Sequence, residues 1–267
     1  MTRSVRLALV LVVALGVSRA TVAAPLDDAF AAYDKGDYAI ALPIIRGLAE
    51  GGDAAAQWAL GLMYQRGTGV GQNFDAAAEW YRRSAEQGYA LGQNNLGILY
   101  MEGMGVFQDN AEAAIWFRRA ADQGFVGAQT ALGHFYEIGR GVPQDFAEAL
   151  AWYTRAADQG SPVGYVQIGK LYANGRGVPL DEAKAVGLFR MAADKGFADG
   201  ALQLGAMYGG GRGAVRDYVQ AYMWFEVARR DPNYVGAAVA NREITAVLMT
   251  PEQITEAQRL ARLWKPN

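Results

Sequence analysis

Few residues of this 267-residue chain could do chemistry. The chain has no cysteine and a single histidine, His134. A thiol nucleophile, a thiolate metal site, a disulfide framework and a histidine-rich metal site are therefore excluded, and any imidazole base would have to be His134 alone. The carboxylates show no pattern typical of catalysis, although two acids from distant segments could meet in the fold, as in a glycosidase.

Three glycine-rich stretches are similar to phosphate-binding loops. Residues 164–170 read G-x-x-x-x-G-K, but Leu171 stands where a serine or threonine would bind magnesium. Residues 67–71 and 209–213 are rich in glycine and lack that lysine. We interpret all three as parts of a repeated helical pattern, so we expect no cofactor, no bound metal and no enzymatic activity.

That pattern is an internal repeat with a period of 36 residues. A Leu-Gly or Ile-Gly pair followed three residues later by tyrosine returns five times, and the tyrosines are Tyr64, Tyr100, Tyr136, Tyr172 and Tyr208. A Gly-x-Gly begins three residues after each tyrosine, where a chain leaving a helix needs positive φ. The next side chains suited to cap a helix are Asn73, Asp109, Asp145, Asp181 and Asp217. Each copy is thus predicted to be a helix, a turn and a second helix.

The second helix of each copy carries a large apolar pair, such as Trp80-Tyr81, and closes at a glycine, such as Gly88. Three residues after a cap, Glu112, Glu148 and Gln220 predict capping boxes. One helix pair cannot bury its apolar stripe alone, so the copies must stack. The sequence predicts an all-α fold, an α-solenoid with a right-handed superhelix and a concave face.

These residues resemble the Sel1-like repeat family, a relative of the tetratricopeptide repeat. The matching sequence motifs are A-x-x-x-L-G-x-x-Y, G-x-G-V, A-x-x-W-Y/F and A-A-x-x-G, and the resemblance covers about residues 53 to 232. The resemblance implies a scaffold that binds a protein or peptide partner. A cell-wall-related ligand binder or hydrolase is the alternative that the family suggests, but the chain lacks the paired cysteines of the relatives linked to β-lactam binding.

The ends of the chain depart from the repeat, as capping units should. We expect a signal peptide over residues 1–24, an N-terminal capping helix pair over 25–52, five repeats over 53–232 and C-terminal capping helices over 233–267. Residues 236–248 read as one helix. Thr250 reads as the N-cap of a closing helix that ends near Trp264.

The first 24 residues have the features of a secretory signal. Arg3 and Arg6 precede an apolar run over residues 7–17, and cleavage is expected after Ala23 or Ala24. The run is shorter than the roughly 20 residues that span a bilayer. Loss of three arginines with the signal would take the formal net charge from −2 to −5. An acidic protein is poorly suited to bind nucleic acid, because such binding depends on neutralising phosphate charges. We expect an exported protein, periplasmic or secreted, without a stable membrane span; a retained signal is the alternative.

First-helix positions that vary between copies and lie opposite the leucine and tyrosine stripe are predicted to line the concave groove. The predicted protein-binding residues are Trp58, Leu62, Asn94, Ile98, Met101, His134, Glu137 and Lys170. They come from three columns, that is, three sets of positions that are equivalent in successive repeats, and these columns also contain Gln65 and Thr130. The predicted residues are mostly apolar in the N-terminal repeats and more polar in the later repeats, which suits an extended peptide or an amphipathic helix as the ligand. Alternatively, Trp58 packs against the N-terminal cap, or the chain is a self-assembling homo-oligomer.

Overall fold

The computed structural model describes residues 20–266, and this part of the chain consists of helices and connecting turns without a strand. The predicted signal peptide falls largely on residues 1–19, which lie outside the described residues. The helices are α1 Ala20–Asp34, α2 Tyr38–Glu50, α3 Ala54–Arg66, α4 Phe74–Glu86, α5 Ala90–Glu102, α6 Asn110–Asp122, α7 Val126–Ile138, α8 Phe146–Asp158, α9 Pro162–Asn174, α10 Glu182–Asp194, α11 Ala198–Gly210, α12 Tyr218–Ala228, α13 Val235–Ala246 and α14 Pro251–Leu263. The predicted all-α fold is confirmed.

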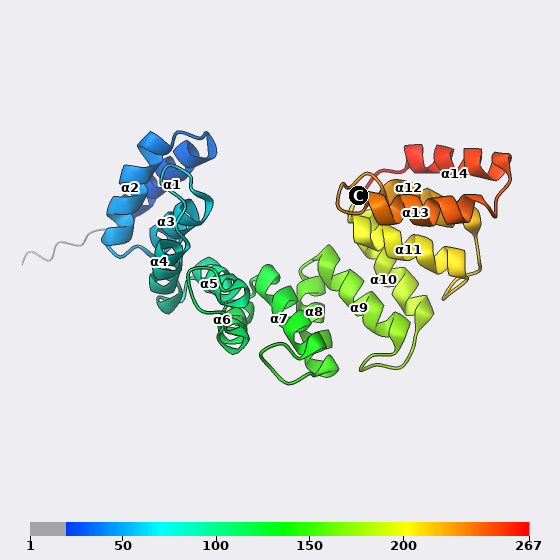
Figure 1. Cartoon of the computed structure of the whole chain (residues 1–267), viewed down its shortest axis with the longest axis horizontal. Helices are drawn as coiled ribbons and strands as arrows, with labels where there is room; N and C mark the ends of the chain where they lie inside the picture. Colours follow the sequence, from blue (N-terminus) through cyan, green and yellow to red (C-terminus); the bar gives the residue numbers. More distant parts are fainter. Residues whose placement is uncertain (1–19, 267) are drawn as a thin grey trace, which may run out of the picture.

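The helices stack in pairs along a curved path (Figure 1). Each first helix packs against its own second helix, which packs against the first helix of the next pair. In the N-terminal half, α1, α3 and α5 lie toward the inside of the arc, and α2, α4 and α6 lie toward its outside. The first helices α3 and α5 also contact each other directly. The chain is therefore an α-solenoid whose N-terminal inner face is formed by first helices.

The recurring Leu-Gly pair explains how the two helices of a repeat approach each other. Leu60 and the aromatic ring of Tyr81 are both buried in the core. A Cβ atom added to Gly61 would lie 2.7 Å from the Tyr81 ring, closer than packed carbon atoms allow. The leucine thus fills the core, while the glycine makes room for the aromatic residue of the second helix.

The turns and caps follow the sequence pattern. Both glycines of each Gly-x-Gly have positive φ, with Gly67 at +72° as the C-cap of α3. Asp109 Oδ1 accepts hydrogen bonds from the backbone N–H groups of Ala111 and Glu112 at 2.9 and 3.0 Å. All five predicted N-caps accept such bonds.

The predicted capping boxes are only half present in the repeats. Within the described residues, the reciprocal bond back to the N-cap is seen at Thr250 and Gln253, at the start of α14. Glu148 instead accepts a hydrogen bond from Trp152 Nε1 at 3.1 Å. The Glu148 carboxylate therefore binds a side chain of its own helix instead of the backbone of the N-cap residue.

The C-terminal helices cover the end of the stack. Helices α13 and α14 both pack on α12. The Trp264 ring meets the buried Trp224 ring edge to face, with the ring centroids 5.7 Å apart, and Ala257 and Ala261 of α14 are buried. Across residues 20–266, the longest apolar helical stretch falls short of what a bilayer crossing needs.

Candidate protein-binding groove

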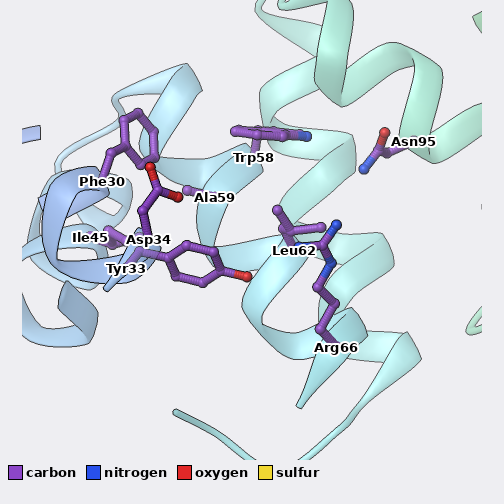
Figure 2. A pocket seen from close by; sticks show the side chains of 9 residues that line it. All are labelled: Phe30, Tyr33, Asp34, Ile45, Trp58, Ala59, Leu62, Arg66 and Asn95. Carbon is purple, nitrogen blue, oxygen red and sulfur yellow. The ribbon is translucent and has the colours of Figure 1, made fainter. Parts of the chain in front are cut away.

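A pocket of about 560 Å³ opens on the inner face near the N-terminal end of the solenoid, lined by residues of α1, α2, α3 and α5 (Figure 2). Its lining residues are Phe30, Tyr33, Asp34, Ile45, Trp58, Ala59, Leu62, Arg66 and Asn95. This volume is typical of a binding pocket, and the lining combines apolar side chains with a few polar groups. We name it the Trp58 pocket.

Helical spacing brings the lining residues together. On α3, Trp58, Leu62 and Arg66 are four residues apart, so they form one stripe along the helix. On α1, Phe30 and Asp34 share the same spacing. Each helix thus contributes an apolar residue to the floor of the pocket and a charged residue at its margin.

Trp58 is half-buried between two elements. Its ring lies 6.4 Å from the Phe30 ring, edge to face, and 6.2 Å from the Tyr89 ring. Trp58 thus packs against the N-terminal cap, which was the alternative left open by the sequence. Its Nε1 is buried and has no hydrogen-bond partner among residues 20–266. An orphaned buried donor of this kind costs about 1–3 kcal/mol.

Two charged groups stand at opposite margins of the pocket. Asp34 and Arg66 are both exposed, and neither forms an ion pair within residues 20–266. Asn95 Oδ1 accepts a hydrogen bond from Asn94 Nδ2 at 3.3 Å, and the Asn95 side-chain nitrogen, which lies near the Tyr81 hydroxyl, is its donor group. Burial raises the pKa of the Tyr81 hydroxyl, while the Asn95 amide and the Arg66 charge act in the opposite direction.

Asn94, predicted to line the groove, is largely covered by protein. Asn94 is only 9% exposed, and its amide is engaged by the neighbouring Asn95. A helix in a solenoid is covered by its own partner and by both neighbouring repeats, so an angle measured from one stripe underestimates burial. Thr130, in the same column, is half-buried and donates to the Gly127 carbonyl at 2.9 Å.

The polar residues further along the inner face are largely engaged within the protein. Glu137 Oε2 accepts a hydrogen bond from the Tyr153 hydroxyl at 2.8 Å, and Arg176 lies 3.7 Å from the same carboxylate. Lys170 Nζ pairs with Asp199 Oδ2 of the next repeat at 2.9 Å. These contacts join repeats, so Glu137 and Lys170 have structural partners before any ligand binds.

His134 is the exposed member of this group. Its Nδ1 lies 4.0 Å from Glu137 Oε2, and about half of its side chain is accessible. By contrast, Ile98 and Met101 are half-buried against the core around Phe117 and Phe135. Of the eight predicted groove residues, Trp58 and Leu62 line the Trp58 pocket.

The residue type in the column of Gln65, Met101 and Glu137 varies partly because it matches the aromatic residue of the second helix in the same repeat. Where the second helix carries tyrosine, the column supplies an acceptor: the Tyr81 hydroxyl donates to Gln65 at 2.6 Å, as Tyr153 does to Glu137. Where it carries phenylalanine, the column is apolar, and the pairs are Phe117 with Met101, Phe189 with Ala173 and Phe225 with Gly209. Comparing the two columns in the sequence would have revealed this match.

Several pocket residues were missed from the sequence. Phe30, Tyr33 and Asp34 belong to α1, which does not follow the repeat, and Arg66 and Asn95 lie in columns beside those selected. The available signal was the four-residue spacing of Arg66 from Leu62. That spacing extends the Trp58 and Leu62 stripe by one turn.

The glycine-rich stretches belong to the helices and turns of the repeat. Residues 164–170 lie within α9, and a Cβ added to Gly164 would lie 2.8 Å from the Ala157 nitrogen, so this glycine permits close helix packing. Among residues 20–266, no three His, Cys, Asp or Glu side chains are grouped as metal ligands. What the inner face offers chemically is an apolar pocket with polar margins.

The similarity to known proteins agrees with this architecture. The Sel1 repeat family matches residues 54–89, 90–125, 126–161, 162–197 and 198–231. The crystal structure of a Sel1 repeat protein from Oxalobacter formigenes is 29% identical, over 91% of this chain and 98% of that chain, with a TM-score of 0.79.

Two further solved structures match with lower structural similarity. A protective antigen of uropathogenic Escherichia coli with an SLR fold is 28% identical over 90% of this chain and 68% of its own, with a TM-score of 0.39. An immunity protein from Pseudomonas aeruginosa is 19% identical over 78% and 81%, with a TM-score of 0.49. No curated protein is matched. Because the five matched segments span more than half of its length, the chain belongs to the Sel1 repeat family.

Proposed function

We propose that this chain is an exported scaffold that binds a protein or peptide partner along the inner face of its solenoid. The observation that carries the proposal is the Trp58 pocket, an apolar hollow on the inner face with charged margins. Sel1 repeat proteins are generally non-enzymatic scaffolds of protein interaction. A preformed apolar pocket bordered by polar groups is the feature expected of a hot spot for a partner's side chain.

A pull-down by crosslinking from the native organism tests this proposal. The inner-face variant carries Leu62→Lys and Ile98→Lys, which place charges on half-buried apolar positions of α3 and α5. The control carries Ile115→Lys and Met191→Lys, on exposed apolar positions of the second helices α6 and α10. Circular dichroism first establishes that both variants are folded.

We expect one specific partner to be captured by the wild-type chain and by the control, and to be lost from the inner-face variant. A partner lost only from the control would move the binding surface to the second helices. If no partner is captured and the mass increases with concentration, the alternative of a self-assembling subunit replaces the proposal.

Export is supported by the N-terminal sequence and by the position of Pro25. Pro25 lies inside α1, where its missing N–H removes a helical hydrogen bond. Cleavage after Ala23 or Ala24 would place Pro25 in the first turn of the helix, where no such bond is needed. Mass spectrometry of the protein from a periplasmic extract tests this: a first residue of Ala24 or Pro25 is expected, and an intact Met1 in the cytoplasmic fraction would contradict export.

A further inference from the structure

The two sides of the Trp58 pocket differ in charge. The Arg66 guanidinium and the Asn95 amide stand on one side, and the Asp34 carboxylate stands on the other (Figure 2). Arg66 can only donate hydrogen bonds, and Asn95 Oδ1 is already occupied by Asn94. One side of the pocket therefore presents donors and a positive charge, and the opposite side presents an acceptor and a negative charge.

The floor between these sides is apolar. Phe30, Leu62 and the Trp58 ring contribute to it, and the volume of about 560 Å³ exceeds what one large side chain occupies. A partner that fills the floor with an apolar side chain thus has room for a polar neighbour at the donor side. Burying the apolar group against aromatic rings would supply most of the binding energy, and the charges would supply direction.

We propose that the Trp58 pocket binds an internal segment of a partner protein in which a large apolar or aromatic side chain stands next to an acidic residue. The apolar side chain lies on Phe30, Leu62 and Trp58, and the carboxylate accepts hydrogen bonds from Arg66 and Asn95. This inference rests on the proposed function and specifies the chemistry of the segment.

At the side formed by Arg66 and Asn95, charge complementarity favours an acid over a base. Arg66 has no carboxylate partner within residues 20–266, so an incoming carboxylate displaces only water from it. A basic residue at this side would meet like charge. Asp34 repels an acid on its own side, and it thereby fixes the direction in which the segment lies.

The orphaned indole N–H of Trp58 adds a second preference for an acceptor. Nε1 is covered by neighbouring atoms, so an acceptor reaches it only when the ring tilts toward the pocket. In Figure 2 the nitrogen edge of Trp58 is directed toward Asn95. The tilt would exchange an unpaired buried donor for a hydrogen bond, which makes it favourable when a carboxylate is present.

An internal segment fits better than a chain end. The inner face continues from α3 to the half-buried apolar side chains of Ile98 and Met101 on α5. A segment whose chain continues past the pocket toward α5 can use those contacts as well, whereas a partner chain that ends at the pocket in that direction cannot.

Indole N–H signals in a ¹H–¹⁵N spectrum of the purified protein test the proposal. The protein contains 6 tryptophans, and the Trp58 signal is identified by its loss in Trp58→Phe. The probes are peptides blocked at both ends: N-acetyl-Phe-Glu-amide, N-acetyl-Phe-Gln-amide and N-acetyl-Gly-Glu-amide. N-acetyl-phenylalanine, which has a terminal carboxylate, distinguishes a chain end from a side chain.

We expect the Phe-Glu peptide to shift the Trp58 signal saturably, and the Phe-Gln peptide to bind about tenfold more weakly, as is usual for loss of a charge-assisted hydrogen bond. Arg66→Gln should abolish this preference for Glu over Gln, whereas Asp34→Asn should strengthen it. Arg46→Gln, an exposed arginine of α2 outside the pocket lining, should leave both affinities unchanged.

Equal affinity for the Phe-Glu and Phe-Gln peptides, or an absent shift of the Trp58 signal with every probe, would overturn the inference. Tighter binding of N-acetyl-phenylalanine than of the Phe-Glu peptide would do so as well, in favour of a chain end. The proposed function would survive any of these outcomes if the Leu62→Lys and Ile98→Lys variant still loses its partner in the pull-down.

Discussion

The Gln87 side-chain amide donates a hydrogen bond to the side-chain oxygen of Gln57 at 2.7 Å. Gln57 in turn donates to the Ala49 carbonyl in the last turn of α2 at 3.1 Å, so two amides connect three consecutive helices. The same relay recurs twice, as Gln123 to Gln93 to Ala85 and as Gln159 to Gln129 to Ala121. Hydrogen bonds between buried amides and helix-end carbonyls thus set the stacking of the N-terminal repeats.

Replacing Gln93 with leucine should reveal the contribution of this relay. Gln93 is buried, and leucine keeps most of its volume while removing both hydrogen bonds. We expect the free energy of unfolding to fall by about 1–2 kcal/mol, measured by urea denaturation with circular dichroism. The control is Gln108→Leu, because exposed Gln108 makes one bond to the Met101 carbonyl, and its loss should cost about 0.5 kcal/mol or less. Equal losses would show that the relay is not special.

Gly105→Ala should be strongly destabilising. Gly105 has φ +68°, and an added Cβ would lie 2.1 Å from the carbonyl oxygen of Phe74 in the preceding repeat. The left-handed conformation alone costs an L-residue roughly 1–2 kcal/mol, and the clash with backbone adds to that cost. Urea denaturation should therefore show a loss of more than about 2 kcal/mol.

Gly71→Ala is the matched control for this prediction. Gly71 lies in the equivalent turn of the first repeat, has negative φ, and has no atom within 4 Å of an added Cβ. Its replacement should be neutral or stabilising by up to about 1 kcal/mol. If Gly105→Ala were as stable as Gly71→Ala, the turn would not determine how closely the repeats approach.

The fold was predictable because its signals are local and repeated. Glycines at positive φ and N-caps such as Asp109 lie within one turn of the residues that they serve, so one sequence contains the evidence. Five copies then show which columns are invariant. The closing helix followed from the same local rules, since Thr250 and Pro251 mark its start.

The inner face was less predictable because two causes produce variation between copies. Glu137 differs from Met101 because its partner is the Tyr153 hydroxyl instead of the Phe117 ring. Asn94 is buried by its neighbours, which a calculation on a single helix does not include. The Trp58 pocket depends on α1, whose Phe30 lies outside the repeat and has no equivalent column.

Alkaline pH should destabilise the protein through two buried tyrosines. Burial raises the pKa of Tyr81 and of Tyr153 above the ordinary value of 10.0, and Glu137 raises the pKa of Tyr153 further. The unfolded chain loses these protons first, so their contribution to stability is complete below about pH 10 and is lost as the pH rises toward the folded pKa.

The variant Tyr81→Phe with Tyr153→Phe should weaken this pH dependence. Phenylalanine already occupies the equivalent position at Phe117, so the change is compatible with the fold. Urea denaturation between about pH 8 and about pH 11 should show a shallower alkaline fall in the free energy of unfolding than in the wild type. Identical slopes would mean that these hydroxyls titrate alike in the folded and unfolded states.

Trp264→Ala should weaken the packing of α14 on the C-terminal end of the solenoid. The Trp264 ring packs edge to face on Trp224, and the Arg230 guanidinium lies over the Trp264 ring, 5.7 Å from its centroid. Because Trp264 is half-buried, we expect a loss of about 2–3 kcal/mol, below the full cost of a buried tryptophan. Loosening α14 would also uncover the apolar surface of α12, so sedimentation should show self-association that rises with concentration.

The control is the neighbouring Leu263, which is 65% exposed. Leu263→Ala should change neither the free energy of unfolding nor the self-association. Similar behaviour of the two variants would mean that the covering of the core end depends on Ala257 and Ala261 instead of on the tryptophan pair.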